Sequence, residues 1–267
     1  MINFPTEQSI RGSYLAQRKL AQLHRWITLQ LDPRADASDL ATASLTSTLQ
    51  GQPCSTTDLS AAVQKHHITH LACDDQTWPN PYMPAPLTVT QDKPSTLAAR
   101  FENTELPLLS EVALSNSSPV DASAQPSAIA HRILALKHRW HAIVEAPQKT
   151  PSALQELIAP SFDMQWGYGG LSGFSELSAW LTKSAASMDA ARHDIAAFAW
   201  EPTGRSTFQA QFDFVWYGYS LELEPMHAES RHTWQIEDDP QERYPRIRDM
   251  SVEFLIPFHT VSGANHD

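Results

Sequence analysis

Four long stretches of alternating polar and apolar residues end this chain, and three helical segments come before them. The alternating stretches cover residues 192–200, 206–220, 227–237 and 246–258. A period of two, with many aromatic and β-branched residues, predicts β-strands. Apolar residues at helical spacing predict helices over residues 127–146, 151–158 and 174–188. Because the helices precede the long strands, we expect an α+β fold in which an antiparallel sheet curls around helices on one face.

A short strand is expected at residues 162–166, between the second and third of these helices. Gly167, Gly169 and Gly170 follow it and are expected to break the strand. The glycines lack the strand–helix context of a dinucleotide-binding loop, so they indicate a turn and no nucleotide cofactor.

Short matches between the two halves of the chain indicate an internal duplication. The residues at 23–26 recur at 137–140 with an offset of 114. Further matches in the same order join 58–61 to 176–179, 66–68 to 193–195 and 95–102 to 206–213. A preserved order predicts a tandem repeat with altered loop lengths, and chance identity between short segments is the alternative.

Domain boundaries follow from a Ser-, Ala- and Pro-rich stretch near the middle of the chain. Residues 116–126 have no hydrophobic periodicity, which is typical of a linker. We therefore expect domains at 1–115 and 127–267, in agreement with a length of 267 residues, which suits about two domains. The first domain repeats the pattern weakly and ends before a final long strand.

Charge and cysteine content restrict the partners and the location. Nineteen Lys and Arg against thirty Asp and Glu give a net charge of −11, which argues against nucleic acid and anionic lipid surfaces. The chain has only Cys54 and Cys73 and no apolar run long enough for a signal peptide or a membrane span. The expected location is the cytoplasm, with reduced thiols and no membrane partner.

The order helix–helix–strand–helix–four strands, with Trp140 on the first helix, resembles the nuclear transport factor two-like superfamily and its SnoaL-like branch. The segments that carry the resemblance are residues 157–166, 171–173, 191–195 and 231–236. Residues 127–258 show it directly, and residues 12–115 only through the repeat. Ketosteroid isomerase and scytalone dehydratase belong to the same superfamily.

The resemblance implies a cone with a deep apolar pocket between the helices and the sheet. It also implies two tandem cone-shaped domains, each with about three N-terminal helices on a curved antiparallel sheet, the second more complete than the first. Such a chain would be a monomer that acts as its own dimer, and a homodimer is the alternative. Members of the superfamily are isomerases, dehydratases, cyclases, hydrolases or non-catalytic binders, so the fold alone does not define the activity.

His232 is the first candidate for proton transfer. Alternation places Ser230, His232 and Trp234 on the inward face of their strand. Burial in an apolar cone lowers the pKa of a histidine, which could then exchange protons near neutral pH; a structural hydrogen-bonding role is the alternative. By the resemblance, His232 occupies the position of the protonated carboxylic acid of ketosteroid isomerase. That enzyme's general base and tyrosine fall on Trp166 and Trp140, which argues against steroid isomerisation.

His193 and Asp163 are further candidates for proton transfer. His193 needs an orienting carboxylate, and Asp194 cannot serve because neighbours on a strand point to opposite faces. By analogy Asp163 lies near the mouth of the pocket and could act, with Tyr168 as a hydroxyl donor, although Asp163 could equally face solvent. The aromatic residues expected to bind a ligand are Trp140, Trp166, Tyr168, Phe198, Trp216 and Trp234.

Histidines crowd the first half of the chain at positions 66, 67 and 70. Their segment predicts the start of a strand, and carboxylate partners at suitable spacing are missing, so no metal is expected. The sequence thus favours a cofactor-free protein that binds a small apolar molecule, either an isomerase, dehydratase or cyclase, or a non-catalytic pseudo-dimeric scaffold. An enzyme requires polar groups converging in an open apolar pocket, and a scaffold requires a closed cone with an exposed apolar patch.

Overall fold

The computed structural model describes residues 4–32, 34, 41–49, 52–53, 55, 70–73, 76–79, 96–101, 109–115, 128–167 and 169–261. The chain divides into two compact units. One unit, here called the cone unit, comprises Met1–Gln17, Leu136–Asp239 and Tyr244–Asp267. The other comprises Arg18–Ala135 and Pro240–Arg243 and is called the second unit. The predicted linker at 116–126 lies outside the described residues, and the predicted domain boundaries stay a prediction.

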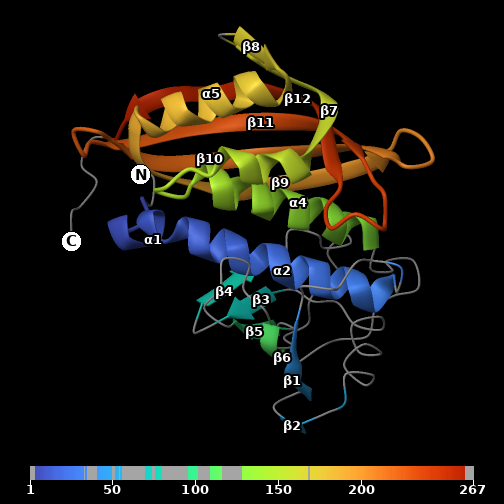
Figure 1. The fold of residues 1–267 in the computed structure, drawn as a ribbon. Helices are drawn as coiled ribbons and strands as arrows, with labels where there is room; N and C mark the ends of the chain where they lie inside the picture. Colours follow the sequence, from blue (N-terminus) through green and yellow to red (C-terminus); the bar gives the residue numbers. More distant parts are fainter. Residues whose placement is uncertain are drawn as a thin grey trace, which may run out of the picture. The chain divides into compact units, whose positions relative to one another are not determined.

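The second half of the chain folds in the predicted order of helices and strands (Figure 1). Helix α4 (Ala128–Val144) is followed by the 3-10 helix η1 (Pro151–Leu157), strands β7 (Ile158–Trp166) and β8 (Gly169–Ser172), and helix α5 (Gly173–Ala185). Four long strands complete the unit: β9 (Met188–Pro202), β10 (Thr207–Ser220), β11 (Pro225–Glu237) and β12 (Arg246–Thr260). The prediction of an α+β fold is confirmed for this half.

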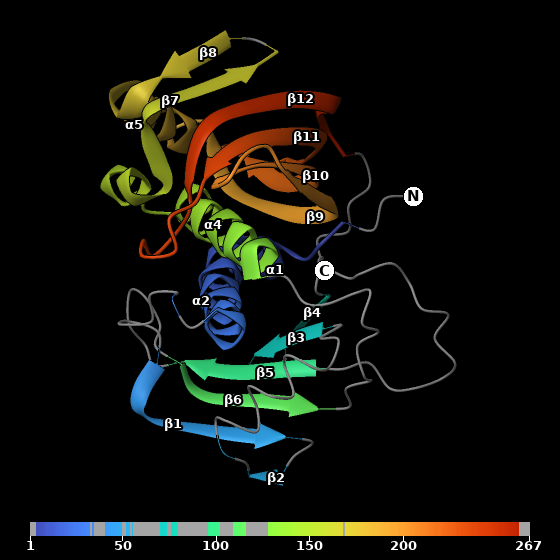
Figure 2. The same cartoon turned by 90° about the vertical axis from the view of Figure 1, so that its right-hand side faces the viewer.

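The sheet of the cone unit has the strand order β8-β7-β12-β11-β10-β9. Its neighbours are antiparallel except for β12 and β7, which are parallel. The long strands curve, and α4 lies along one face of the sheet (Figure 2). Aromatic rings from α4 and from the sheet meet in the core, where the ring centres of Trp140 on α4 and Trp234 on β11 are 6.1 Å apart.

Alternation along β10 sorts its side chains as the sequence predicts. Ala210, Phe212, Phe214 and Trp216 are buried on the inward face, whereas the outward residues Gln209, Gln211, Asp213, Val215 and Tyr217 are partly exposed and Tyr219 is buried. The outward face is covered at one end, because the ring of Phe4 contacts Tyr217 and Tyr219 edge-on at 5.5 and 6.0 Å. Short helix α1 (Glu7–Arg11) follows, with the side chain of Thr6 accepting a hydrogen bond from the backbone N–H of Ser9.

Strand β7 ends at Trp166 and Gly167 lies in a turn, as predicted, but Gly169 and Gly170 differ from the prediction because they belong to a further strand, β8. They pair with Trp166 and Gln165 of β7, so the ladder between strands prevails over the weak strand preference of glycine. Gly173 then adopts a positive φ of 71°, a conformation suited to glycine, where the chain turns into α5.

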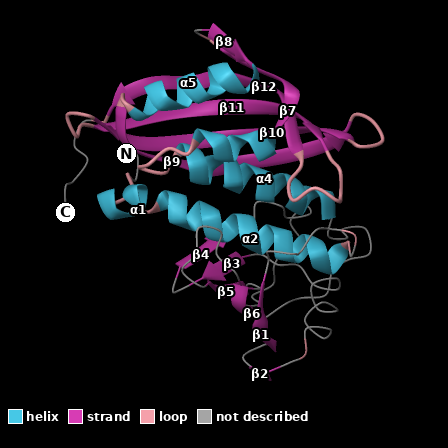
Figure 3. Cartoon of the chain, in the orientation of Figure 1, coloured by secondary structure: helices cyan, strands magenta, loops and turns pink. Residues whose placement is uncertain are grey.

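The second unit contains most of helix α2 (Ser13–Leu31) and a sheet of six short strands (Figure 3). The strands are β1 (Ala41–Leu49), β2 (Gln52–Pro53), β3 (His70–Cys73), β4 (Gln76–Pro79), β5 (Thr96–Phe101) and β6 (Leu109–Ser115). Their order is β2-β1-β6-β5-β3-β4. The first half therefore has a last strand, β6, but with seven residues it is half as long as the fifteen-residue β12. Within the described part of the chain, no helix combines the length and apolarity that a membrane span requires.

Candidate functional site: an imidazole-lined apolar cavity

A cavity of about 450 Å³ lies within the cone unit, between α4, α5 and the sheet. This volume suits a small molecule. The lining is rich in aromatic and sulfur-containing side chains, which include Trp140, Trp166, Trp180, Trp216, Phe254, Phe258, Met164, Met188, Met226 and Met250. The titratable and hydroxyl groups on its wall include His141, Glu145, Lys149, Asp189, His193, Ser230 and His232. An apolar enclosure with a few converging polar groups is typical of a ligand site.

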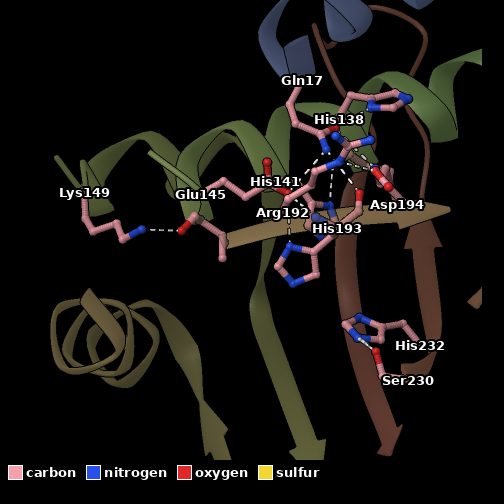
Figure 4. Close-up of polar contacts among 12 residues, drawn as sticks. Gln17, His138, His141, Glu145, Lys149, Arg192, His193, Asp194, Ser230 and His232 are labelled. Atoms are coloured by element: carbon pink, nitrogen blue, oxygen red, sulfur yellow. Dashed lines mark hydrogen bonds and ion pairs between the residues drawn. The ribbon is translucent and has the colours of Figure 1, made fainter. Parts of the chain in front are cut away.

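His193 and Glu145 form the central polar pair of the cavity (Figure 4). Glu145 follows α4, and its side chain is fully buried. One carboxylate oxygen, Oε1, accepts hydrogen bonds from the backbone N–H of His193 at 2.9 Å and from its Nδ1 at 3.0 Å. A carboxylate can only accept, so Nδ1 of His193 carries a proton. In the neutral imidazole, Nε2 then keeps its lone pair, which is the arrangement of an oriented general base.

Gln17 of α2 connects this pair to two buried side chains of α4, Lys137 and His138. Its amide nitrogen donates to Glu145 Oε1 and to the carbonyl oxygen of His193, both at 3.3 Å. Its amide oxygen accepts from Lys137 Nζ at 3.2 Å and from His138 Nδ1 at 2.6 Å. Burial lowers the pKa of Lys137 to about 8, against the attraction of Glu145, which raises it.

His141 lies one helical turn before Glu145, and its ring is tilted by 53° against that of His193. Its Nδ1 donates to the carbonyl oxygen of Lys137 at 2.9 Å, and its ring centre lies 4.4 Å from that of His193. Burial, together with the nearby charges of His193 and Lys137, holds the pKa of His141 well below its usual value. His141 is therefore a neutral imidazole in the wall near pH 7.

His232 lies on the inward face of β11, as predicted, and lines the cavity. Its Nε2 lies 3.1 Å from Ser230 Oγ, and its ring packs edge-on against Phe214 at 4.8 Å. Burial lowers the pKa of His232 to about 3. This value is far below neutral, so the ring stays neutral there, and the structural hydrogen-bonding alternative fits His232 better than proton exchange near pH 7.

The third candidate, Asp163, lies on β7 but is not among the residues that line the cavity. Its carboxylate accepts a hydrogen bond from the hydroxyl of Ser172 on β8. Asp194 pairs with Arg192 at 2.7 Å, consistent with the expectation that it does not orient His193. Tyr168 lies outside the described residues.

Three of the aromatic residues expected to bind a ligand line the cavity: Trp140, Trp166 and Trp216. The other two described ones, Phe198 and Trp234, are not among the lining residues. Phe198 stacks on Phe212 at 5.0 Å, and Trp234 is fully buried in the core. Period-two alternation identifies the inward face, but it does not separate the positions that fill the core from those that border the cavity.

Glu145, Lys149 and Gln17 were not among the site residues predicted from the sequence. Glu145 lies four residues after His141, so both occupy one face of the helix, and this i, i+4 spacing beside Trp140 was the available signal. Lys149 lines the cavity, and its ammonium donates to the carbonyl oxygen of Val144. Burial lowers the pKa of Lys149.

Metal binding was not expected, and among the described residues no group of three or more His, Cys, Asp or Glu side chains is placed to hold a metal ion. His66 and His67 lie outside the described residues, and His70 begins β3.

The fold and the cavity define an α+β cone with a ligand-sized apolar interior. No protein family model matches the chain, and no curated protein matches it. Solved structures that are similar include hexachlorocyclohexane dehydrochlorinase LinA-type3 from Novosphingobium barchaimii LL02, at 13% identity and a TM-score of 0.45, covering 52% of this chain and 93% of that one.

A nuclear transport factor 2-like superfamily protein from Salmonella enterica is similar at 17% identity and a TM-score of 0.39, covering 49% of this chain and 92% of that one. A protein with a cystatin-like fold from Nostoc punctiforme is similar at 12% identity and a TM-score of 0.39, covering 46% and 88%.

Proposed function

We propose that the cone unit binds a small, largely apolar molecule and moves a proton on it without a cofactor, as an isomerase, dehydratase or cyclase does. The observation that carries this proposal is the bond of 3.0 Å between His193 Nδ1 and the buried carboxylate of Glu145, in the wall of the apolar cavity. His193 is the general base in this proposal, and Glu145 orients it.

The reaction begins when Nε2 of His193 accepts a proton from a carbon atom of the ligand. The electron pair of the broken C–H bond moves into the ligand, where it shifts a double bond or expels a leaving group. Glu145 stabilises the imidazolium that forms, and the apolar walls strengthen that attraction because they exclude water. The return of the proton to another ligand atom completes an isomerisation, and its transfer to the leaving group completes an elimination.

Ser230 supplies a donor on β11 for charge that develops on the ligand. Nδ1 of the neutral His232 is buried and has no hydrogen-bond partner among the described residues. A buried N–H without a partner costs more than a buried lone pair, so the ring proton belongs on Nε2, where it is donated to Ser230 Oγ. The hydroxyl proton of Ser230 then remains available to a ligand oxygen, and His232 acts by orienting it.

A non-catalytic scaffold is the second candidate, and exposed apolar side chains on β12 favour it. Leu255, Ile256 and Phe258 are 43%, 38% and 45% exposed. The open cavity favours ligand binding instead, because a scaffold gains nothing from an unfilled interior.

A ligand screen separates the two functions. We expect native mass spectrometry or a thermal-shift screen of steroids, aromatic polyketide-like molecules, fatty acids and hydroxylated metabolites to find a stabilising small molecule. A hit is then tested for turnover with wild type, Glu145→Gln and the matched control Asp194→Asn, which alters a carboxylate paired with Arg192. The proposal expects turnover to fall by a factor of about 100 or more only in Glu145→Gln. Binding without turnover in wild type would contradict the catalytic role, and an empty screen would favour the scaffold.

We also propose that the chain is a tandem duplication that acts as its own dimer in the cytoplasm. The order of the two sheets supports this. When the strands of each half are numbered from one to six along the chain, the strand order is 2-1-6-5-3-4 in the sheet of β1 to β6 and 2-1-6-5-4-3 in the sheet of β7 to β12. In both, the first strand pairs with the last in parallel, and the fifth pairs with the last antiparallel. The halves differ at one edge, where β3 takes the place next to β5.

A further inference from the structure

Gln17 is a buried side chain whose four hydrogen bonds all join it to α4, Glu145 or β9. It is 5% exposed and belongs to α2, near the start of the chain. Its amide nitrogen reaches Glu145 and His193, and its amide oxygen reaches Lys137 and His138. A glutamine that only packs two helices together does not need its whole bonding capacity directed at one charged cluster.

The surroundings fix the orientation of this amide. Lys137 Nζ can only donate, so it must face the amide oxygen of Gln17. The carboxylate of Glu145 and the carbonyl oxygen of His193 can only accept, so they must face the amide nitrogen. A flipped amide would turn donors toward an ammonium and an oxygen toward a carboxylate, which would leave buried groups unsatisfied.

The amide thus stands between opposite charges and keeps Glu145 directed at His193. Lys137 and Glu145 attract each other, and burial strengthens that attraction. Without an intervening amide, the ammonium and the carboxylate would gain by approaching each other, and Oε1 would leave the two N–H groups of His193.

We propose that Gln17 is a positioning residue of the proton-transfer site: by donating to Glu145 and accepting from Lys137, it holds the carboxylate against Nδ1 of His193. The inference rests on the proposed role of the His193–Glu145 pair. It means that residues 127–267 do not contain the whole site, because a side chain from the beginning of the chain completes it.

The test observes the Nδ1 proton of His193 by ¹⁵N–¹H NMR in the full-length protein, without a ligand. In wild type we expect a protected Nδ1–H signal and a nuclear Overhauser effect to the carboxamide protons of Gln17. In Gln17→Met, which keeps the side-chain length but cannot donate or accept in the same way, we expect that proton to exchange with water about tenfold faster or more. Gln22→Met is the matched control, since Gln22 is also buried on α2 and accepts from Arg25.

Gln17→Glu is the second variant, in case the methionine variant does not fold. Glu at this position keeps an acceptor for Lys137 and His138 but removes the donors to Glu145, so the same loss of protection is expected. Unchanged protection in either folded variant, or a wild-type spectrum without the effect between Gln17 and His193, would overturn the proposal.

The outcome is independent of whether the protein is an enzyme. Loss of protection in the variants, together with an empty ligand screen, would leave Gln17 as the residue that positions Glu145 while the proposed function fails. With a substrate in hand, the positioning role predicts a fall in kcat of about tenfold or more at nearly constant KM in Gln17→Met. Equal turnover in wild type and Gln17→Met would refute the positioning role even if His193 is the base.

Discussion

Replacement of His232 by leucine should remove a large part of the acid sensitivity of the cone unit. His232 is buried, and burial lowers its pKa from 6.5 to about 3. The unfolded chain therefore binds a proton at this side chain below pH 6.5, whereas the folded chain resists protonation down to about pH 3. Between these values the unfolded state holds more protons, so the free energy of unfolding falls as the pH falls. Above pH 6.5 the contribution is constant.

The size of the effect follows from the two pKa values. Each pH unit inside the window changes the free energy of unfolding by about 1.4 kcal/mol for one titrating group. Between pH 6.5 and pH 5 this amounts to about 2 kcal/mol, and over the whole window to about 5 kcal/mol. Leucine has no titrating group and a similar volume, so this part of the pH dependence should disappear in the variant.

Urea denaturation at pH 8, 7, 6 and 5, followed by tryptophan fluorescence, measures the difference. Trp140 and Trp234 report on the core beside His232. His232→Leu should lose about 2 kcal/mol less stability than wild type between pH 8 and pH 5, whatever its stability at pH 8. Phe214→Leu is the control, because Phe214 touches the same ring but does not titrate. Parallel pH curves for wild type and His232→Leu would refute the assignment of His232 as a buried neutral imidazole.

Three further predictions follow from the cavity and from the repeat. Gly218→Ala should lower the free energy of unfolding, measured by urea denaturation, by about 1–3 kcal/mol. The added Cβ would lie 2.6 Å from the carbonyl oxygen of Ala190 and 2.3 Å from the ring of Trp216. Gly167→Ala is the control and should be nearly neutral, because nothing lies within 4 Å of its added Cβ. Lys149→Met should tighten the binding of neutral apolar probes and weaken that of anionic ones, measured by calorimetry, because it removes an ammonium from the cavity wall. Light scattering should give a mass near 29.8 kDa if the chain acts as its own dimer, and twice that mass would favour a homodimer.

Periodicity was sufficient to predict helix α4 and the four long strands of the cone unit. The helix expected over residues 127–146 is α4 at Ala128–Val144, and each long strand was placed to within a few residues of its observed ends. What periodicity could not supply was β8, since glycines have little strand preference and only the ladder to β7 makes Gly169 and Gly170 extended. Pairing between strands depends on the tertiary structure, so the local sequence pattern does not reveal it.

The candidate site was harder to predict than the fold, for a related reason. His232 lies on a strand with alternating polar and apolar residues, so its inward direction could be inferred from the sequence. Glu145 comes just after the end of α4, where a carboxylate is ordinarily solvated, but its side chain is fully buried against His193 of β9 and Gln17 of α2. Asp163 was favoured by analogy, although its partner is Ser172 on the neighbouring strand.

The contacts between α2 and α4 connect the positioning of Glu145 with the proposed duplication. In the cone unit Gln17 contacts His138, and in the second unit His24 lies 2.9 Å from His131, Nδ1 to Nδ1. The offset of 114 residues that relates the two helices takes Gln17 to His131 and His24 to His138. The pair Gln17–His138 therefore corresponds to the pair His24–His131. Such a correspondence is expected where two related helices pair through the same surface, as in an isologous contact. In the pair near the cavity, the amide of Gln17 accepts from Lys137 through its oxygen and donates to Glu145 through its nitrogen.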